Sequence, residues 1–101
     1  MNRRHELHEM LCDILGSRNV YFQPPENVRL KYPCIVYERS EIRNRNADDE
    51  VYRQTFHYLI TVIDPDPDST IVDSLSILSK IRFNRHFVVD GLNHDVFSIY
   101  Y

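Results

Sequence analysis

The sequence predicts a single α+β domain, a two-layer sandwich in which two helices cover one face of a mostly antiparallel sheet of about five strands. Three observations predict this fold. Apolar residues recur at helical spacing within residues 3–15, they alternate along residues 52–64, and a segment rich in Pro and Asp follows that strand and precedes a second helical pattern. The expected order of elements is α-β-β-β-α-β-β over residues 1–101.

The first helix is expected over residues 3–15. Its apolar residues fall on one stripe with acidic residues and His between them, and Gly16 stands where a helix commonly ends. The stripe consists of Leu7, Met10, Leu11, Ile14 and Leu15.

Three strands are expected next. Residues 19–23 have strand composition and are stopped by Pro24 and Pro25, and residues 33–39 form a nearly continuous apolar run. Residues 52–64 give the strongest pattern, because alternate residues are apolar over most of the segment. One face of that strand carries Phe56, Tyr58, Ile60 and Val62, and the other carries Leu59 and Ile63.

A long polar loop is expected between the second and third strands, over residues 40–51. This segment is longer than a tight hairpin connection requires. The excess length indicates a role beyond joining two strands.

The remaining elements are a helix over residues 67–80 and two closing strands over residues 83–89 and 94–101. Asp66 is the expected N-cap of the helix, and Pro67 suits its first position. Asp90-Gly91 is typical of a two-residue hairpin turn. The helix is expected to bury Ile71, Leu75, Leu78 and Val72.

The composition excludes several classes of protein. Lys and Arg number 12 against 15 Asp and Glu, for a formal charge of −3, which disfavours a general nucleic-acid binder. With only 2 Gly there is no glycine-rich phosphate loop. No apolar run is long enough for a membrane span, so a soluble protein in a reducing compartment is expected. Cys12 and Cys34 fit that setting as small core residues.

No catalytic, metal or cofactor site is expected. His5 and His8 are three residues apart, whereas the metalloprotease helix motif needs a spacing of four. Asp64, Asp66 and Asp68 match the start of a calcium loop, but that loop then requires a Gly and a Glu that are missing here. Turn formation and helix capping explain the same aspartates, and a catalytic nucleophile has no supporting motif. The chain is therefore not expected to be an enzyme.

Charged residues of both signs concentrate in and beside the expected loop, where they nearly cancel. A DNA-reading patch would not carry its own acids, whereas a self-complementary surface between subunits of a homo-oligomer would. A solvated hairpin tip is the alternative interpretation. The candidate subunit-interface residues are Arg39, Arg43, Arg45, Asp48, Asp49, Glu50 and Arg53.

Three segments resemble the tail terminator, or tail completion, proteins of tailed bacteriophages. They are residues 32–37 (YPCIVY), residues 58–69 (YLITVIDPDPDS) and residues 83–96 (FNRHFVVDGLNHDV). The resemblance implies a small α+β domain that assembles into a ring, typically a hexamer, on the head-proximal end of the tail tube. In that family the extended hairpin loop commonly contributes to the subunit interface and lumen, which corresponds to residues 40–51 here.

The resemblance implies a virion structural protein that is assembled in the host cytoplasm and located in the tail or neck. Its partners would be further copies of itself, the tail tube protein and a head-side connector protein, with DNA passing through the lumen without specific binding. Two alternatives stay open at this point. One is a head-closure or neck connector ring protein, and the other is a small monomeric module that binds one partner.

Overall fold

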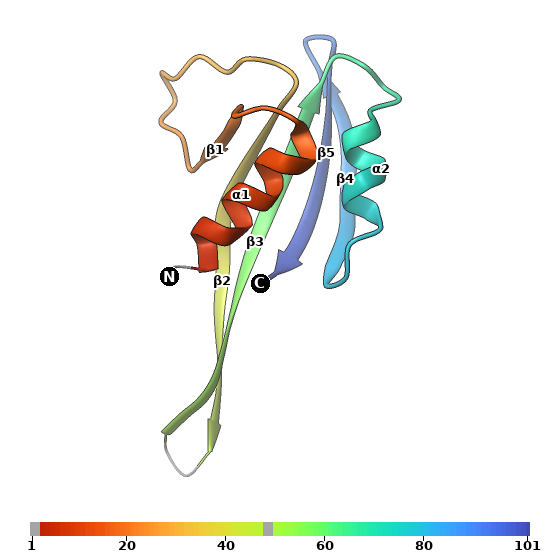
Figure 1. Cartoon of the computed structure of the whole chain (residues 1–101). Coiled ribbons are helices and arrows are strands. Elements are labelled where there is room, and N and C mark those ends of the chain that lie inside the picture. Colours follow the sequence, from red (N-terminus) through yellow and green to blue (C-terminus); the bar gives the residue numbers. More distant parts are fainter. Residues whose placement is uncertain (1–2, 48–49) are drawn as a thin grey trace.

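The structure is a computed structural model that describes residues 3–47 and 50–101, and for residues 43–54 it describes the backbone but not the side chains. Two helices lie on one face of a five-stranded sheet (Figure 1). The helices are α1 (Arg3–Leu15) and α2 (Thr70–Ser76), and the strands are β1 (Val20–Phe22), β2 (Cys34–Ala47), β3 (Glu50–Asp64), β4 (Ile81–Val89) and β5 (Leu92–Tyr100).

The strands are arranged in the order β1-β2-β3-β5-β4. β1 is parallel to β2, and the other three pairs of neighbouring strands are antiparallel. The predicted fold class and order of elements are therefore confirmed. β1 and β4 are therefore the two edge strands of the sheet.

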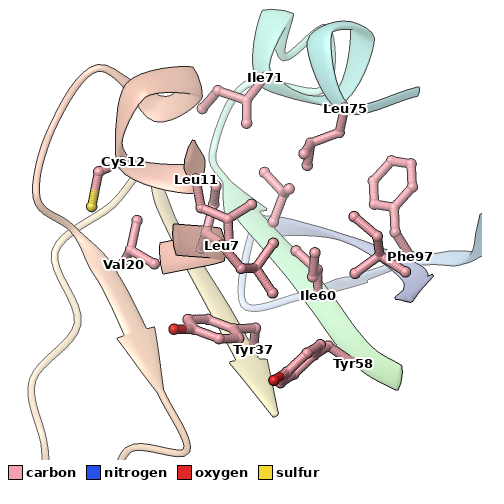
Figure 2. Close-up of a cluster of buried hydrophobic side chains, with 13 residues drawn as sticks. Leu7, Leu11, Cys12, Val20, Tyr37, Tyr58, Ile60, Ile71, Leu75 and Phe97 are labelled. Atoms are coloured by element: carbon pink, nitrogen blue, oxygen red, sulfur yellow. The ribbon is translucent and has the colours of Figure 1, made fainter. Parts of the chain in front are cut away.

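The core lies between the helices and one face of the sheet (Figure 2). The predicted periodicities account for it: alternate residues of β3 and one stripe of each helix are the buried ones. Fully buried side chains include Leu7, Leu11, Tyr37, Tyr58, Ile60, Val62, Leu75 and Phe97. Phe56, Val72 and Leu78, also predicted to face inward, are partly buried against this cluster.

Both cysteines are buried and free, as expected for small core residues. Cys34 has no exposed surface, and burial raises the pKa of its thiol to about 11. At neutral pH this thiol is protonated and therefore a poor nucleophile.

The second helix is shorter than residues 67–80, and its N-cap is Ser69 and not Asp66. Asp64 and Asp66 instead accept hydrogen bonds from the backbone N–H groups two residues further on, at 2.8 and 2.9 Å. Such turns compete with helix geometry, so the helix starts only after the Asp- and Pro-rich segment. It ends at Ser76, and the next residue, Ile77, is 84% exposed.

The prediction of a loop over residues 40–51 is wrong. β2 and β3 continue through it as one antiparallel hairpin, with paired residues as far as Ala47 and Glu50 (Figure 1). A two-stranded ladder satisfies the backbone of a polar segment without any buried side chain, so polar composition does not require a loop. The hairpin projects beyond the helices and accounts for the long axis of a molecule measuring 52 × 27 × 23 Å.

Candidate assembly surfaces

The projecting part of the hairpin is called the arm below and comprises residues 43–47 and 50–55. The register places Arg43 opposite Thr55 and Arg45 opposite Arg53. Glu50 starts β3 opposite Ala47. Five of the seven predicted interface residues thus lie on the two strands of this hairpin. Asp48 and Asp49 lie outside the described residues.

Arg39 differs from the other predicted interface residues, because it lies where the hairpin leaves the domain. Its guanidinium lies over the Phe56 ring, 5.2 Å from the centroid. Its backbone N–H donates to the side-chain oxygen of Gln23 at 3.1 Å. These contacts tie Arg39 to the body of the domain and not to the arm.

A second surface, which the sequence analysis did not identify, is strand β4. Residues 82–89 are all exposed although four of them are large and apolar. They are Phe83, Phe87, Val88 and Val89, with 52, 36, 58 and 48% of their surface exposed. β4 is a margin of the sheet, so its outer N–H and C=O groups have no neighbouring strand within the described chain. Long apolar edge strands are uncommon because they pair with other chains.

The sequence predicts this strand but not its exposure. The run Phe-Val-Val at residues 87–89 is strand-forming and indicates a strand. Whether a strand lies at the edge of the sheet depends on strand order, however. Here β5 lies between β3 and β4, which leaves β4 at the edge. No local pattern specifies that insertion.

His8, on α1, forms part of a small polar cluster beneath the helix. The imidazole Nδ1 lies 2.7 Å from the Tyr37 hydroxyl, and Arg4 donates to the same hydroxyl at 3.3 Å. Burial lowers the pKa of His8, and the nearby Arg18 and Arg4 guanidinium groups lower it further. The hydroxyl of Tyr58 is buried and has no hydrogen-bond partner among the described residues. The cluster belongs to the packing of α1 on the sheet.

The lowered pKa of His8 predicts how stability changes with pH. The unfolded chain binds this proton at the ordinary pKa of 6.5, whereas the folded chain binds it only at lower pH. The free energy of unfolding should therefore fall as the pH drops below 6.5, until the folded pKa is reached. Urea unfolding at pH 7.5 and 5.5 measures this slope. The H8Q variant should show a shallower slope, and an unchanged slope would contradict the assignment to His8.

Several polar residues near the turns of the sheet have structural partners. Asp95 on β5 pairs with His86 on the neighbouring strand β4, with 2.8 Å between Asp95 Oδ1 and His86 Nδ1. Its sequence neighbour His94 instead lies near the Leu92 carbonyl oxygen. Asn93 donates to the backbone oxygens of Asp64 and Pro65 at 3.1 and 3.3 Å. Within residues 3–47 and 50–101, no group of three or more His, Cys, Asp or Glu side chains is arranged to hold a metal ion.

A groove of about 600 Å³ lies where α1 and the segment after α2 meet the end of β5. Its lining mixes charged and aromatic groups, among them Arg3, Glu6, Met10, Lys80, Tyr100 and Tyr101. Because Thr55 also lines it, the groove lies beside the base of the arm. The arm and the groove are thus at the same end of the domain.

Among the helices that the structure describes, none has the length and apolar character needed to cross a membrane. No protein-family model and no curated protein matches the chain.

Proposed function

We propose that this chain is a virion structural protein that forms a ring, typically of six subunits, on the head-proximal end of a phage tail tube. The ring ends tube polymerisation and joins the tail to the head-side connector. The observation that carries the proposal is the arm, a two-stranded ribbon that extends beyond the helices of a small domain. A two-stranded hairpin alone is only marginally stable in water, so such a ribbon gains stability when it packs on another subunit.

The resemblance of three segments to tail terminators supports the same function. In that family the extended hairpin loop commonly contributes to the subunit interface and lumen, and we take the arm as its counterpart in this chain. The exposed apolar strand β4 supplies a second surface suited to contact with another protein.

The shape of the proposed ring would explain how it ends the growth of the tail tube. A tube grows because each ring presents the same surface as the ring before it, and a ring with one tube-like face and one different face ends the series. Six simultaneous contacts give high avidity even when each contact is weak. The formal charge of −3 suits a lumen through which DNA passes without being retained.

Electron microscopy of assembled tails tests the location. The protein should occur as one ring per tail, at the end nearest the head. Density between the tail and the portal, with a separate ring on the tube, would identify a head-closure protein instead. Density along the tube would overturn both assignments, and a chain that stays monomeric and binds a single partner would be a binding module.

Charge reversal of Arg43 and Arg45 together is expected to impair ring formation and leave the fold intact. Both residues lie on β2 within the arm. Light scattering after size-exclusion chromatography measures assembly, and circular dichroism checks the fold. Normal assembly of R43E/R45E would show that the arm is only a solvated hairpin.

A further inference from the structure

The outer edge of β4 has backbone groups that no neighbouring strand satisfies within residues 3–47 and 50–101. At the start of this strand, the Tyr100 N–H donates to the Lys80 carbonyl oxygen at 3.3 Å. Successive residues of an antiparallel strand direct their N–H and C=O groups alternately to one side and to the other. Because Lys80 directs its carbonyl toward β5, Ile81 and Phe83 direct their backbone groups outward.

The other end of β4 extends this row of open backbone groups. Val89 pairs with Leu92 across a two-residue turn, and residues that flank such a turn are expected to bond to each other. Counting back from Val89, Val88 and His86 are the residues that direct their backbone groups outward. Donors and acceptors therefore face away from the sheet along the whole strand, at Ile81, Phe83, His86 and Val88.

The side chains beside these backbone groups are more apolar than solvent contact favours. Phe83 and Val88 are 52 and 58% exposed, although both lie on the helix-covered side of the sheet. Phe87 and Val89, on the other side, are also exposed. A strand added at this edge would bury apolar surface on both sides and satisfy the open backbone groups at the same time.

The charge on β4 is of one sign. Arg82 and Arg85 are exposed, and β4 contains no acidic residue. They pair with Ser98 and Val96, which flank the core residue Phe97, so both arginines point to the face of the sheet without helices. A register shift between them keeps both on this face although they are three positions apart. On an added strand, acidic side chains at alternate positions would lie beside them.

A second copy of this chain is a poor source of such a strand. The arm also has open strand edges, but its β2 strand carries Arg43 and Arg45, which have the same sign of charge as β4. The charge of β4 therefore favours a segment of a different protein.

We propose that the outer edge of β4 binds an extended acidic segment of another protein, which adds a strand to the five-stranded sheet. Backbone hydrogen bonds would supply affinity, and carboxylates beside Arg82 and Arg85 would supply specificity. The inference rests on β4 and goes beyond the proposed ring, whose subunit contact is the arm.

Three synthetic peptides test this proposal with the full chain. The acidic peptide is acetyl-Val-Glu-Val-Glu-Val-Glu-Val-amide, and in the basic peptide Lys replaces each Glu. In the third, acetyl-Val-Glu-Pro-Glu-Pro-Glu-Val-amide, the charge is unchanged but Pro removes two backbone donors and disfavours a strand. Fluorescence anisotropy of labelled peptides measures binding. The acidic peptide should bind about tenfold or more tightly than either of the others.

Hydrogen exchange of the backbone amides, measured by NMR, locates the bound peptide. The N–H groups of Ile81, Phe83, His86 and Val88 should exchange about tenfold or more slowly when the acidic peptide is bound, because they then donate hydrogen bonds. Slowed exchange at residues 41–47 instead would place the added strand on the arm and overturn the assignment to β4.

Charge reversal on β4 tests the specificity. R82E/R85E should weaken binding of the acidic peptide about tenfold or more and should bind the basic peptide more tightly than the wild type does. R29E/K31E is the matched control, because it makes the same change of charge at exposed residues in the segment between β1 and β2. It should bind the acidic peptide as the wild type does, and circular dichroism checks each fold.

Three further results would overturn the proposal. They are no measurable binding at millimolar acidic peptide, equal binding of the acidic and basic peptides, and slowed exchange of the same amides in the wild type alone as its concentration rises. The last result would make a second copy the occupant of β4.

The outcome is independent of the proposed function. A chain that binds the acidic peptide but is absent from assembled tails keeps this site and loses the proposed function. A chain that forms a ring on tails but binds no peptide keeps the proposed function and loses this site.

Discussion

Replacing Phe97 by Ala is expected to lower the free energy of unfolding by about 3–5 kcal/mol. Phe97 has no exposed surface, lies within β5 and belongs to the core cluster, where Figure 2 shows it near Leu75 of α2. Because a small domain is stable by only about 5–15 kcal/mol in total, this is a large share. Urea denaturation of the purified variant measures the effect.

The neighbouring strand offers a matched control. Phe83 pairs with Phe97 across the sheet, with ring centroids 5.5 Å apart, but it is 52% exposed. F83A should cost about 1 kcal/mol, most of it from the lost ring contact. Equal costs for F97A and F83A would contradict the description of β4 as an exposed margin.

Shortening the arm is expected to abolish ring assembly while leaving the domain folded. The change replaces residues 44–54 by Asn-Gly, which closes a two-residue hairpin between Arg43 and Thr55. The core residues that the structure describes all lie outside residues 44–54, so the melting temperature should stay within about 5 °C of the wild type, a shift equivalent to roughly 1 kcal/mol. Thermal unfolding and light scattering give the two readouts.

The interpretation depends on both measurements. A shortened chain that unfolds much earlier would show that the arm stabilises the domain itself. A shortened chain that assembles fully would remove the main support for the proposed function. Restoring the arm with its natural sequence should restore assembly.

The spacing of apolar residues predicts the helices and strands that bury only one of their faces. The stripe of α1 and the alternation of β3 correspond directly to the buried residues Leu7, Leu11, Tyr58 and Ile60. The end of α2 could not be predicted in this way. Its apolar pattern continues to Leu78, but the helix stops at Ser76 and leaves Ile77 84% exposed.

The candidate site was predicted only in part. The concentration of charge singles out residues 40–51, but their polar sequence lacks the apolar alternation that identifies strands and therefore predicts a loop. The sequence does not predict the exposed surface of β4, because that exposure depends on which strand lies at the edge of the sheet.

The charges on β4 also bear on the fate of a subunit before assembly. An exposed apolar strand invites two copies to pair through the same strand, which would give a closed dimer or an aggregate. Arg82 and Arg85 would then face the arginines of the other copy, and the repulsion disfavours that product. The two arginines of β4 therefore disfavour the pairing of one β4 with another and help to keep separate copies of the chain apart.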